Sequence, residues 1–265
     1  IWIHIDYNIN SRKWESFGSR NNTNLNQDYL YLTIMSIIKH CSNYFNIILI
    51  NDDSFKLLLE NWNIDLNYVS NPQKTYLRKL ALIKILYKYG GLLIEPSFIM
   101  LKSLDKIYKK VLNTKKICVG EFPNNSINSH AIKTMPSTNF IGCIKNCPKM
   151  KEFDNYLAIL FTNDYSDEIN IEDQINKWLF NETQSNNINY IDGKYIGTKD
   201  NKNNVLQLEE LLGTSRLDIN EKAYCIYIPR NDILKRNSYS YYASLNNKEV
   251  LEANANISKY LLLTL

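Results

Sequence analysis

Apolar and polar positions alternate along the chain in blocks that predict strands and helices in turn. Residues 1–5 form a short, mostly apolar run that ends at Asp6, and residues 47–50 form a second run that ends at Asn51-Asp52-Asp53. Continuous apolar runs of this length are typical of buried parallel strands. Polar and acidic residues directly after such strands lie at the edge where α/β folds bind ligands. The two runs therefore predict two core strands.

Helical spacing appears between and after these runs. Apolar residues recur at helical spacing from Tyr29 to Ile38, and a longer helix is predicted from Pro72 to Tyr87. Proline is favoured in a first helical turn, and Gly90-Gly91 is typical of a helix C-cap. Further strands are predicted at 92–94, 98–101, 117–120, 139–142, 189–191 and 224–229, and further helices at 53–60, 148–161, 171–180 and 249–263.

This alternation of strands and helices predicts an α/β fold with a mostly parallel sheet flanked by helices. A chain of 265 residues with 45% hydrophobic residues is long enough to bury a sizeable core. No internal repeat or low-complexity linker interrupts it, so we expect one domain over residues 1–265. Asp53 or Ser54 is the expected N-cap of the short helix that runs to Glu60.

Composition narrows the possible partners and compartment. The net charge of +4 is small and the basic residues are dispersed, so nucleic-acid binding is not expected. Five widely spread cysteines favour reduced, buried thiols and an intracellular location, and Cys143 and Cys147 lack a second ligand pair for zinc. No apolar run reaches the about 18 residues of a membrane span. The chain starts at Ile1, so an initiator or anchor segment could precede it.

The segment from Arg78 to Leu104 has the most ordered pattern in the chain. An amphipathic helix is followed by Gly90-Gly91, an apolar strand, the polar break Glu95-Pro96-Ser97 and then Leu101-Lys-Ser-Leu104. This order resembles the signature of the family 32 glycosyltransferases, whose sugar-binding motif is Asp-x-Asp. The resemblance implies a GT-A-like, Rossmann-like fold and a nucleotide-sugar ligand. In that family the two aspartates hold the divalent cation that neutralises the departing diphosphate.

The polar positions of the signature are altered in this chain. When the glycines are aligned, the family's two aspartates fall at Glu95 and Ser97, its Ser-Asp falls at Arg78-Lys79, and its arginine falls at Leu82. One carboxylate and one hydroxyl make a poor Mg²⁺ or Mn²⁺ site, so we expect no metal and no cofactor. Arg78 and Lys79 either replace the charge of the metal or face solvent, and Glu95 is either a catalytic candidate or a strand-end residue.

The resemblance extends over roughly residues 1–160, the expected donor-site half, and is strongest from 76 to 104. Residues 161–265 form a variable part in which no family motif can be placed. Alternative structural roles are open for several candidates: a core histidine at position 4, and a strand-start asparagine at position 139. The candidate substrate-binding residues are His4, Asp6, Asp52, Arg78, Lys79, Gly90, Gly91, Glu95, Ser97 and Asn139, with Glu95 also the candidate catalytic residue.

Three functions are compatible with this pattern. The first is a glycosyltransferase-like protein that has lost metal-dependent catalysis and acts as a structural component with a protein partner. The asparagine-rich composition resembles that of uncharacterised proteins of large DNA viruses, which implies a virion- or capsid-associated role. The second is an active hexosyltransferase that uses Glu95 with Arg78 and Lys79, either without a metal or with Mn²⁺ or Mg²⁺ as its cofactor. The third is a sugar- or nucleotide-binding module without turnover. We favour the first, because the polar set is altered as a group.

Overall fold

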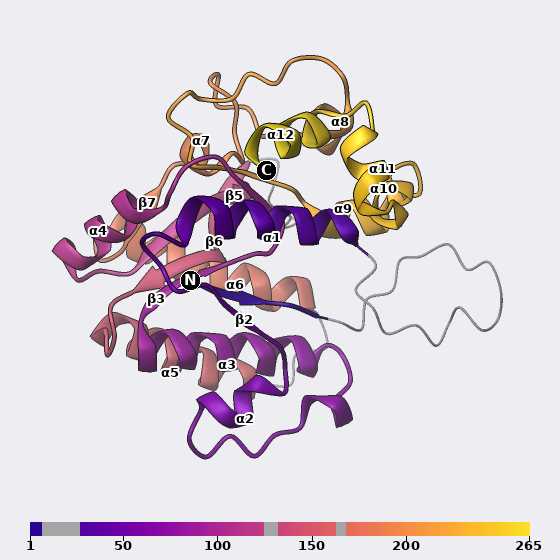
Figure 1. Ribbon diagram of the computed structural model, residues 1–265. Helices are drawn as coiled ribbons and strands as arrows, with labels where there is room; N and C mark the ends of the chain where they lie inside the picture. The colour runs from indigo at the N-terminus through magenta and orange to yellow at the C-terminus, as the bar shows by residue number, and fades with distance from the viewer. Residues whose placement is uncertain (7–26, 125–131, 163–167) are drawn as a thin grey trace. The chain divides into compact units, whose positions relative to one another are not determined.

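The computed structural model describes residues 1–6, 27–124, 132–162 and 168–265 (Figure 1). The chain divides into two compact units. Unit 1 comprises Ile1–His4, Ile48–Glu95 and Leu104–Gly193, and unit 2 comprises Ile5–Ile47, Pro96–Ser103 and Lys194–Leu265. The expectation of one domain over residues 1–265 stays a prediction.

Unit 1 contains a six-stranded sheet in the described part of the chain. The strand order is β2 (Ile48–Ile50), β1 (Trp2–His4), β3 (Gly91–Ile94), β6 (Thr134–Cys143), β5 (Cys118–Pro123) and β7 (Asn189–Ile191). Strands β2, β1 and β3 are mutually parallel, β6 runs antiparallel to both β3 and β5, and β7 is parallel to β5. Five strands therefore share one direction, which confirms the predicted α/β class with a mostly parallel sheet.

Three long helices flank this sheet on the same side (Figure 1). They are α3 (Gln73–Tyr89), α5 (Pro148–Thr162) and α6 (Glu168–Gln184). Ile83 of α3, Ile141 of β6 and Phe153 of α5 are fully buried in one continuous apolar core. The core stabilises the layer arrangement that the apolar pattern predicts. The shorter helices of unit 1 are α2 (Ser54–Leu58), the 3-10 helix η2 (Leu66–Tyr68) and α4 (Asp105–Thr114).

Close packing and backbone geometry require glycine at both positions that follow α3. Gly90 is the C-cap with φ +74°, and a Cβ there would lie 2.6 Å from the backbone nitrogen of Lys145. Gly91 has φ +106° and faces the indole of Trp2, whose Nε1 donates to the Gly90 carbonyl oxygen at 2.9 Å. Only glycine adopts such a backbone and leaves this space free. The predicted C-cap is confirmed.

Unit 2 is built around a short antiparallel pair, β4 (Phe98–Met100) and β8 (Cys225–Tyr227). Helices α1 (Asp28–Cys41) and α12 (Asn256–Thr264) pack against β4. Ring contact between Tyr29 and the buried Tyr242 joins α1 to α10. The remaining short helices are α7 (Gly193–Ile196), α8 (Leu208–Leu212), α9 (Arg230–Lys235), α10 (Ser240–Ser244) and α11 (Asn247–Glu252).

The prediction of one helix over residues 249–263 is wrong. The chain forms α11 and α12 instead, because Ala253 and Ala255 adopt extended backbone angles between them. The buried Asn256 fixes this break, since its Nδ2 donates to the carbonyl oxygens of Glu210 and Ser215.

Two expectations from composition can be compared with the structure. All five cysteines are buried free thiols, as the cysteine spacing predicts. Among the described residues, no helix combines the length and apolar character needed to cross a bilayer.

Candidate functional site

The candidate site lies at the carboxyl ends of β1 and β2. These strands pair in parallel with His4 opposite Ile50, so the residue that ends β1 lies next to the loop that follows β2. His4 Nε2 is 2.9 Å from Oδ1 of Asp52 in that loop. The sequence predicted both residues as ligand contacts at this edge, and the structure brings them together.

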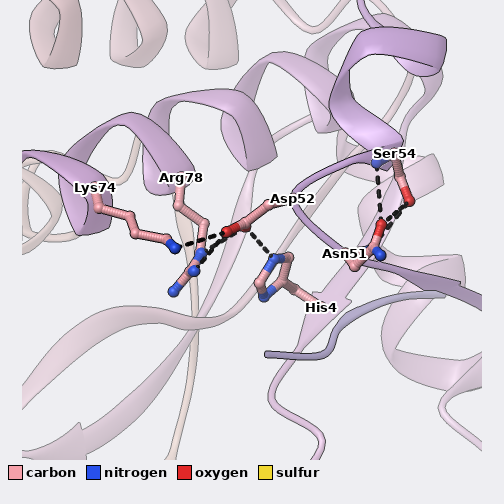
Figure 2. A network of polar contacts seen from close by, with 6 residues as sticks. All are labelled: His4, Asn51, Asp52, Ser54, Lys74 and Arg78. Carbon is pink, nitrogen blue, oxygen red and sulfur yellow. Dashed lines mark hydrogen bonds and ion pairs between the residues drawn. The ribbon is translucent and has the colours of Figure 1, made fainter. Parts of the chain in front are cut away.

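Helix α3 adds two cations to the same carboxylate (Figure 2). Arg78 Nε donates to Asp52 Oδ1 at 2.7 Å, and Arg78 Nη2 donates to Asp52 Oδ2 at 2.6 Å. Lys74 Nζ lies 3.9 Å from Oδ2. Residues four apart share a helix face, which explains why both cations reach one acid. His4, Asp52, Lys74 and Arg78 are called the Asp52 cluster below.

The Asp52 cluster is largely but not completely covered. The side chains of His4, Asp52, Lys74 and Arg78 are 11%, 14%, 17% and 18% exposed. Burial by itself would raise the pKa of Asp52, but the hydrogen bonds from His4 and Arg78 together with the charge of Arg78 hold that pKa well below its usual range. Asp52 is therefore a carboxylate at neutral pH, and it faces two permanently charged side chains.

Two reciprocal hydrogen bonds between Asn51 and Ser54 position the loop that carries Asp52. Asn51 Oδ1 accepts from the backbone nitrogen of Ser54, and Ser54 Oγ accepts from the backbone nitrogen of Asn51, both at 3.1 Å (Figure 2). Asp53 occupies the N-cap position of α2 but makes no side-chain capping bond there and is exposed. The predicted N-cap position is therefore confirmed for Asp53, without a hydrogen bond from its side chain.

Arg78 and Lys79 point to different partners. Lys79 forms an ion pair with Glu172 of α6, and its side chain is only 17% exposed. Leu82 packs against the apolar core of unit 1. The alternative that both cations face solvent is wrong. Arg78 and Lys79 contact different acids, because adjacent residues on a helix project in different directions.

The positions of the family's two aspartates lie in different units. Glu95 follows β3 in unit 1, is partly buried, and donates its backbone N–H to the Asn139 carbonyl oxygen at 3.1 Å. Ser97 lies in unit 2 with a fully buried side chain, and its Oγ has no hydrogen-bond partner among the described residues. Asn139 and Asp6 are each partly buried. Because Ser97 Oγ is closed to solvent, it offers no ligand to a hydrated cation.

The donor atoms of the Asp52 cluster do not fit a divalent cation. Both carboxylate oxygens of Asp52 accept hydrogen bonds from cationic or ring nitrogens, whereas hard cations require several unengaged oxygens. Within residues 1–6, 27–124, 132–162 and 168–265, no three His, Cys, Asp or Glu side chains are grouped to hold a metal. The cluster suits an anion better than a cation.

Sequence reasoning missed Lys74 and the pairing of Arg78 with Asp52. The available signal was the spacing of two basic residues four apart near the start of a helix that has no acid in its first turn. The acid that completes the arrangement comes from a loop 26 residues before Arg78, which periodicity within one helix cannot reveal.

No protein-family model and no curated protein matches the chain. Among solved structures it is similar to the galactosyltransferase LgtC in complex with donor and acceptor sugar analogs, at 10% identity over 73% of each chain with a TM-score of 0.39. It is also similar to the PaToxG glycosyltransferase, at 16% identity over 69% of this chain and 68% of the other, with a TM-score of 0.35.

Both of these similar structures are glycosyltransferases, the class that the sequence resemblance implies. The likeness concerns the fold alone.

Proposed function

We propose that this chain is a glycosyltransferase-like protein that has lost metal-dependent catalysis and serves as a structural component of a protein assembly. The observation that carries the proposal is the Arg78–Asp52 ion pair. Arg78 stands where the resembled family has a polar, acid-containing donor-site pair, and its guanidinium is committed to a carboxylate of the same chain. This position therefore stabilises the fold.

The other altered positions support the same proposal. Metal-dependent sugar transfer needs carboxylates that share one cation near the diphosphate. Here one aspartate position is the fully buried Ser97, and Lys79 is paired with Glu172. Glu95 is the one acid left in the motif. A single carboxylate supplies too little charge and too few oxygens for Mg²⁺ or Mn²⁺, so the proposal includes no cofactor.

The structural role follows from the resemblance and the composition. The residues that pack the signature segment are kept, whereas its polar donor-site residues are changed together. We expect this pattern when selection acts on the fold and no longer on turnover. The likeness in composition to proteins of large DNA viruses supports a virion- or capsid-associated form of this role. Five buried free thiols accord with assembly in a reducing environment.

Donor hydrolysis tests the loss of catalysis. The protein is incubated with UDP-linked and GDP-linked hexoses, with Mn²⁺ or with EDTA, and released nucleotide is measured. We expect no release above the buffer blank under either condition. Release that requires Mn²⁺ would refute the proposal. Release in EDTA that is abolished in Glu95→Gln would instead establish the metal-independent hexosyltransferase.

A further inference from the structure

Helix α4 of unit 1 concentrates positive charge on its exposed face. Residues 105–116 include five lysines and one aspartate, a net charge of +4 that equals the net charge of the whole chain. Lys106, Lys109 and Lys110 lie three and four residues apart, so they share one face of the helix. Lys115 follows as the C-cap, and all four side chains are exposed. These four lysines are called the α4 basic face below.

Ion pairing distinguishes α4 from α3, which is also rich in basic residues. Each cation of α3 pairs with an acid from another part of unit 1; these cations are Lys74, Arg78, Lys79, Lys84 and Lys88. On α4, Asp105 lies 3.1 Å from Lys109. Lys106, Lys110 and Lys115 form no ion pair with any residue that the structure describes. The charge of α3 is thus compensated within the fold, whereas most of the charge of the α4 basic face is open to solvent.

The start of α5 lies beside the end of α4 and does not offset this charge. Cys147 Sγ, which precedes α5, lies 3.7 Å from the Lys115 carbonyl oxygen. Two acids near this end of α5, Glu152 and Glu182, both pair with Lys149. Neither of these two described acids forms an ion pair with the α4 basic face. The positive charge therefore continues around the C-terminal end of α4.

Leu112 adds an apolar side chain beside these lysines. It is 48% exposed and lies three residues from both Lys109 and Lys115. Helices that lie in the headgroup region of a bilayer combine exposed leucine with lysine in this way. The leucine enters the apolar boundary, while the aliphatic stems of the lysines follow it and their ammonium groups stay among the headgroups.

We propose that the α4 basic face, together with Leu112, binds the surface of an anionic lipid bilayer. Such a bilayer presents many mobile anionic headgroups, so it suits lysines that no described residue holds in a fixed geometry. Helix α4 contains no arginine, and the hydroxyl of Tyr108, its one aromatic residue, donates to the Cys143 carbonyl oxygen at 3.4 Å. A nucleic acid is disfavoured, because no side chain of this face can stack on a base. Lipid binding goes beyond the proposed structural role and does not depend on it.

Vesicle co-sedimentation tests this surface. The protein is mixed with vesicles of phosphatidylcholine alone, or of phosphatidylcholine and phosphatidylserine in equal amounts. We expect binding to the mixed vesicles only, and a loss of that binding at high salt, because salt screens exposed charges. Lys106→Gln combined with Lys110→Gln should bind about 25-fold more weakly, since each lysine near an anionic surface contributes about fivefold. Leu112→Ser should weaken binding about fivefold, because half of a leucine side chain no longer leaves water.

Lys56→Gln combined with Lys248→Gln is the matched control, because it removes the same two charges at exposed lysines outside α4. Its affinity for the mixed vesicles should equal that of the wild type. The inference is overturned if the wild type binds mixed vesicles no better than phosphatidylcholine vesicles. Equal weakening in the two double variants also overturns it, since the effect is then one of net charge.

Two soluble polyanions distinguish a bilayer from other acidic partners. A DNA duplex and polyglutamate are titrated at the same concentration of negative charge as the mixed vesicles. We expect the vesicles to bind most tightly, because they alone offer an apolar layer to Leu112. Tighter binding of either polyanion overturns the inference, since the partner is then a nucleic acid or an acidic protein. None of these results bears on donor hydrolysis, so the two proposals fail separately.

Discussion

Replacing Asp52 by asparagine should destabilise the protein by about 2 kcal/mol. Breaking one partner of a fully buried ion pair costs about 3–5 kcal/mol. The side chains of the Asp52 cluster keep 11–18% of their surface exposed, so solvent compensates part of that loss. The introduced asparagine would keep the shape and one acceptor oxygen, but the Arg78 guanidinium would lose its counter-charge. The destabilisation therefore reflects charge and not volume.

Urea unfolding followed by circular dichroism measures this change. With a slope of about 3 kcal/mol per M for a chain of this size, the unfolding midpoint should fall by about 0.7 M. Asp53→Asn is the matched control, since the exposed neighbour undergoes the same chemical change and should shift stability by less than about 0.5 kcal/mol. Equal shifts in the two variants would refute the assigned role of Asp52.

The pH dependence of the same variant gives an independent check. The folded-state pKa of Asp52 is lowered, so the unfolded chain takes up the proton first as the pH falls. The stabilisation is complete above the unfolded pKa of about 4 and is lost as pH falls toward the lower folded pKa. The stability difference between wild type and Asp52→Asn should therefore be constant near neutrality and shrink in acid. A difference that grows in acid contradicts the sign of this coupling.

Three further predictions concern other parts of the fold. The interaction with the Cys143 side chain lowers the pKa of Cys147 below that of an ordinary thiol, so ultraviolet thiolate absorbance should show a step below pH 8 that Cys147→Ser removes; no such step would contradict it. Gly90→Ala should cost about 3 kcal/mol in thermal unfolding, because φ is +74° and the new Cβ would meet backbone of Lys145; an unchanged midpoint would refute this. Asn256→Ala should cost about 2 kcal/mol in urea unfolding, because the buried amide of Asn256 donates to the carbonyl oxygens of Glu210 and Ser215 and both hydrogen bonds are lost; a loss under about 0.5 kcal/mol would count against it.

The strands and long helices of unit 1 were predictable because their residues carry local signals. The apolar run at residues 47–50 marks β2, although this strand lies at the sheet edge and buries only Ile50, and α3 shows helical spacing with glycine at its end. Such apolar patterns arise because buried positions recur along the chain with the period of the helix or strand that carries them. The class of fold therefore follows from the sequence.

The break between α11 and α12 was not predictable in this way. The residues around it have helical spacing, and the extended backbone at Ala253 and Ala255 depends on where Asn256 finds its acceptors. Those acceptors, the carbonyl oxygens of Glu210 and Ser215, lie 46 and 41 residues earlier in the chain. Tertiary hydrogen bonds override local propensity here.

The candidate site was predictable in location but not in geometry. His4 ends β1 and Asp52 follows β2, and the apolar runs reveal that both lie at the edge where α/β sheets bind ligands. The direction of each α3 side chain is set by the register of the helix against the sheet. In the structure Arg78 pairs with Asp52 and Lys79 pairs with Glu172. From the sequence alone, each cation could either lie in the site or face solvent.

Direct measurement of Mn²⁺ binding tests the central claim, that metal-dependent donor chemistry has been lost. Free Mn²⁺ is followed by its electron paramagnetic resonance signal as the protein is added in the presence of UDP or GDP. We predict that the free Mn²⁺ signal stays at the level set by the nucleotide alone. A stoichiometric loss of that signal, abolished by Glu95→Gln, would show that the altered motif still holds the metal and would contradict the account.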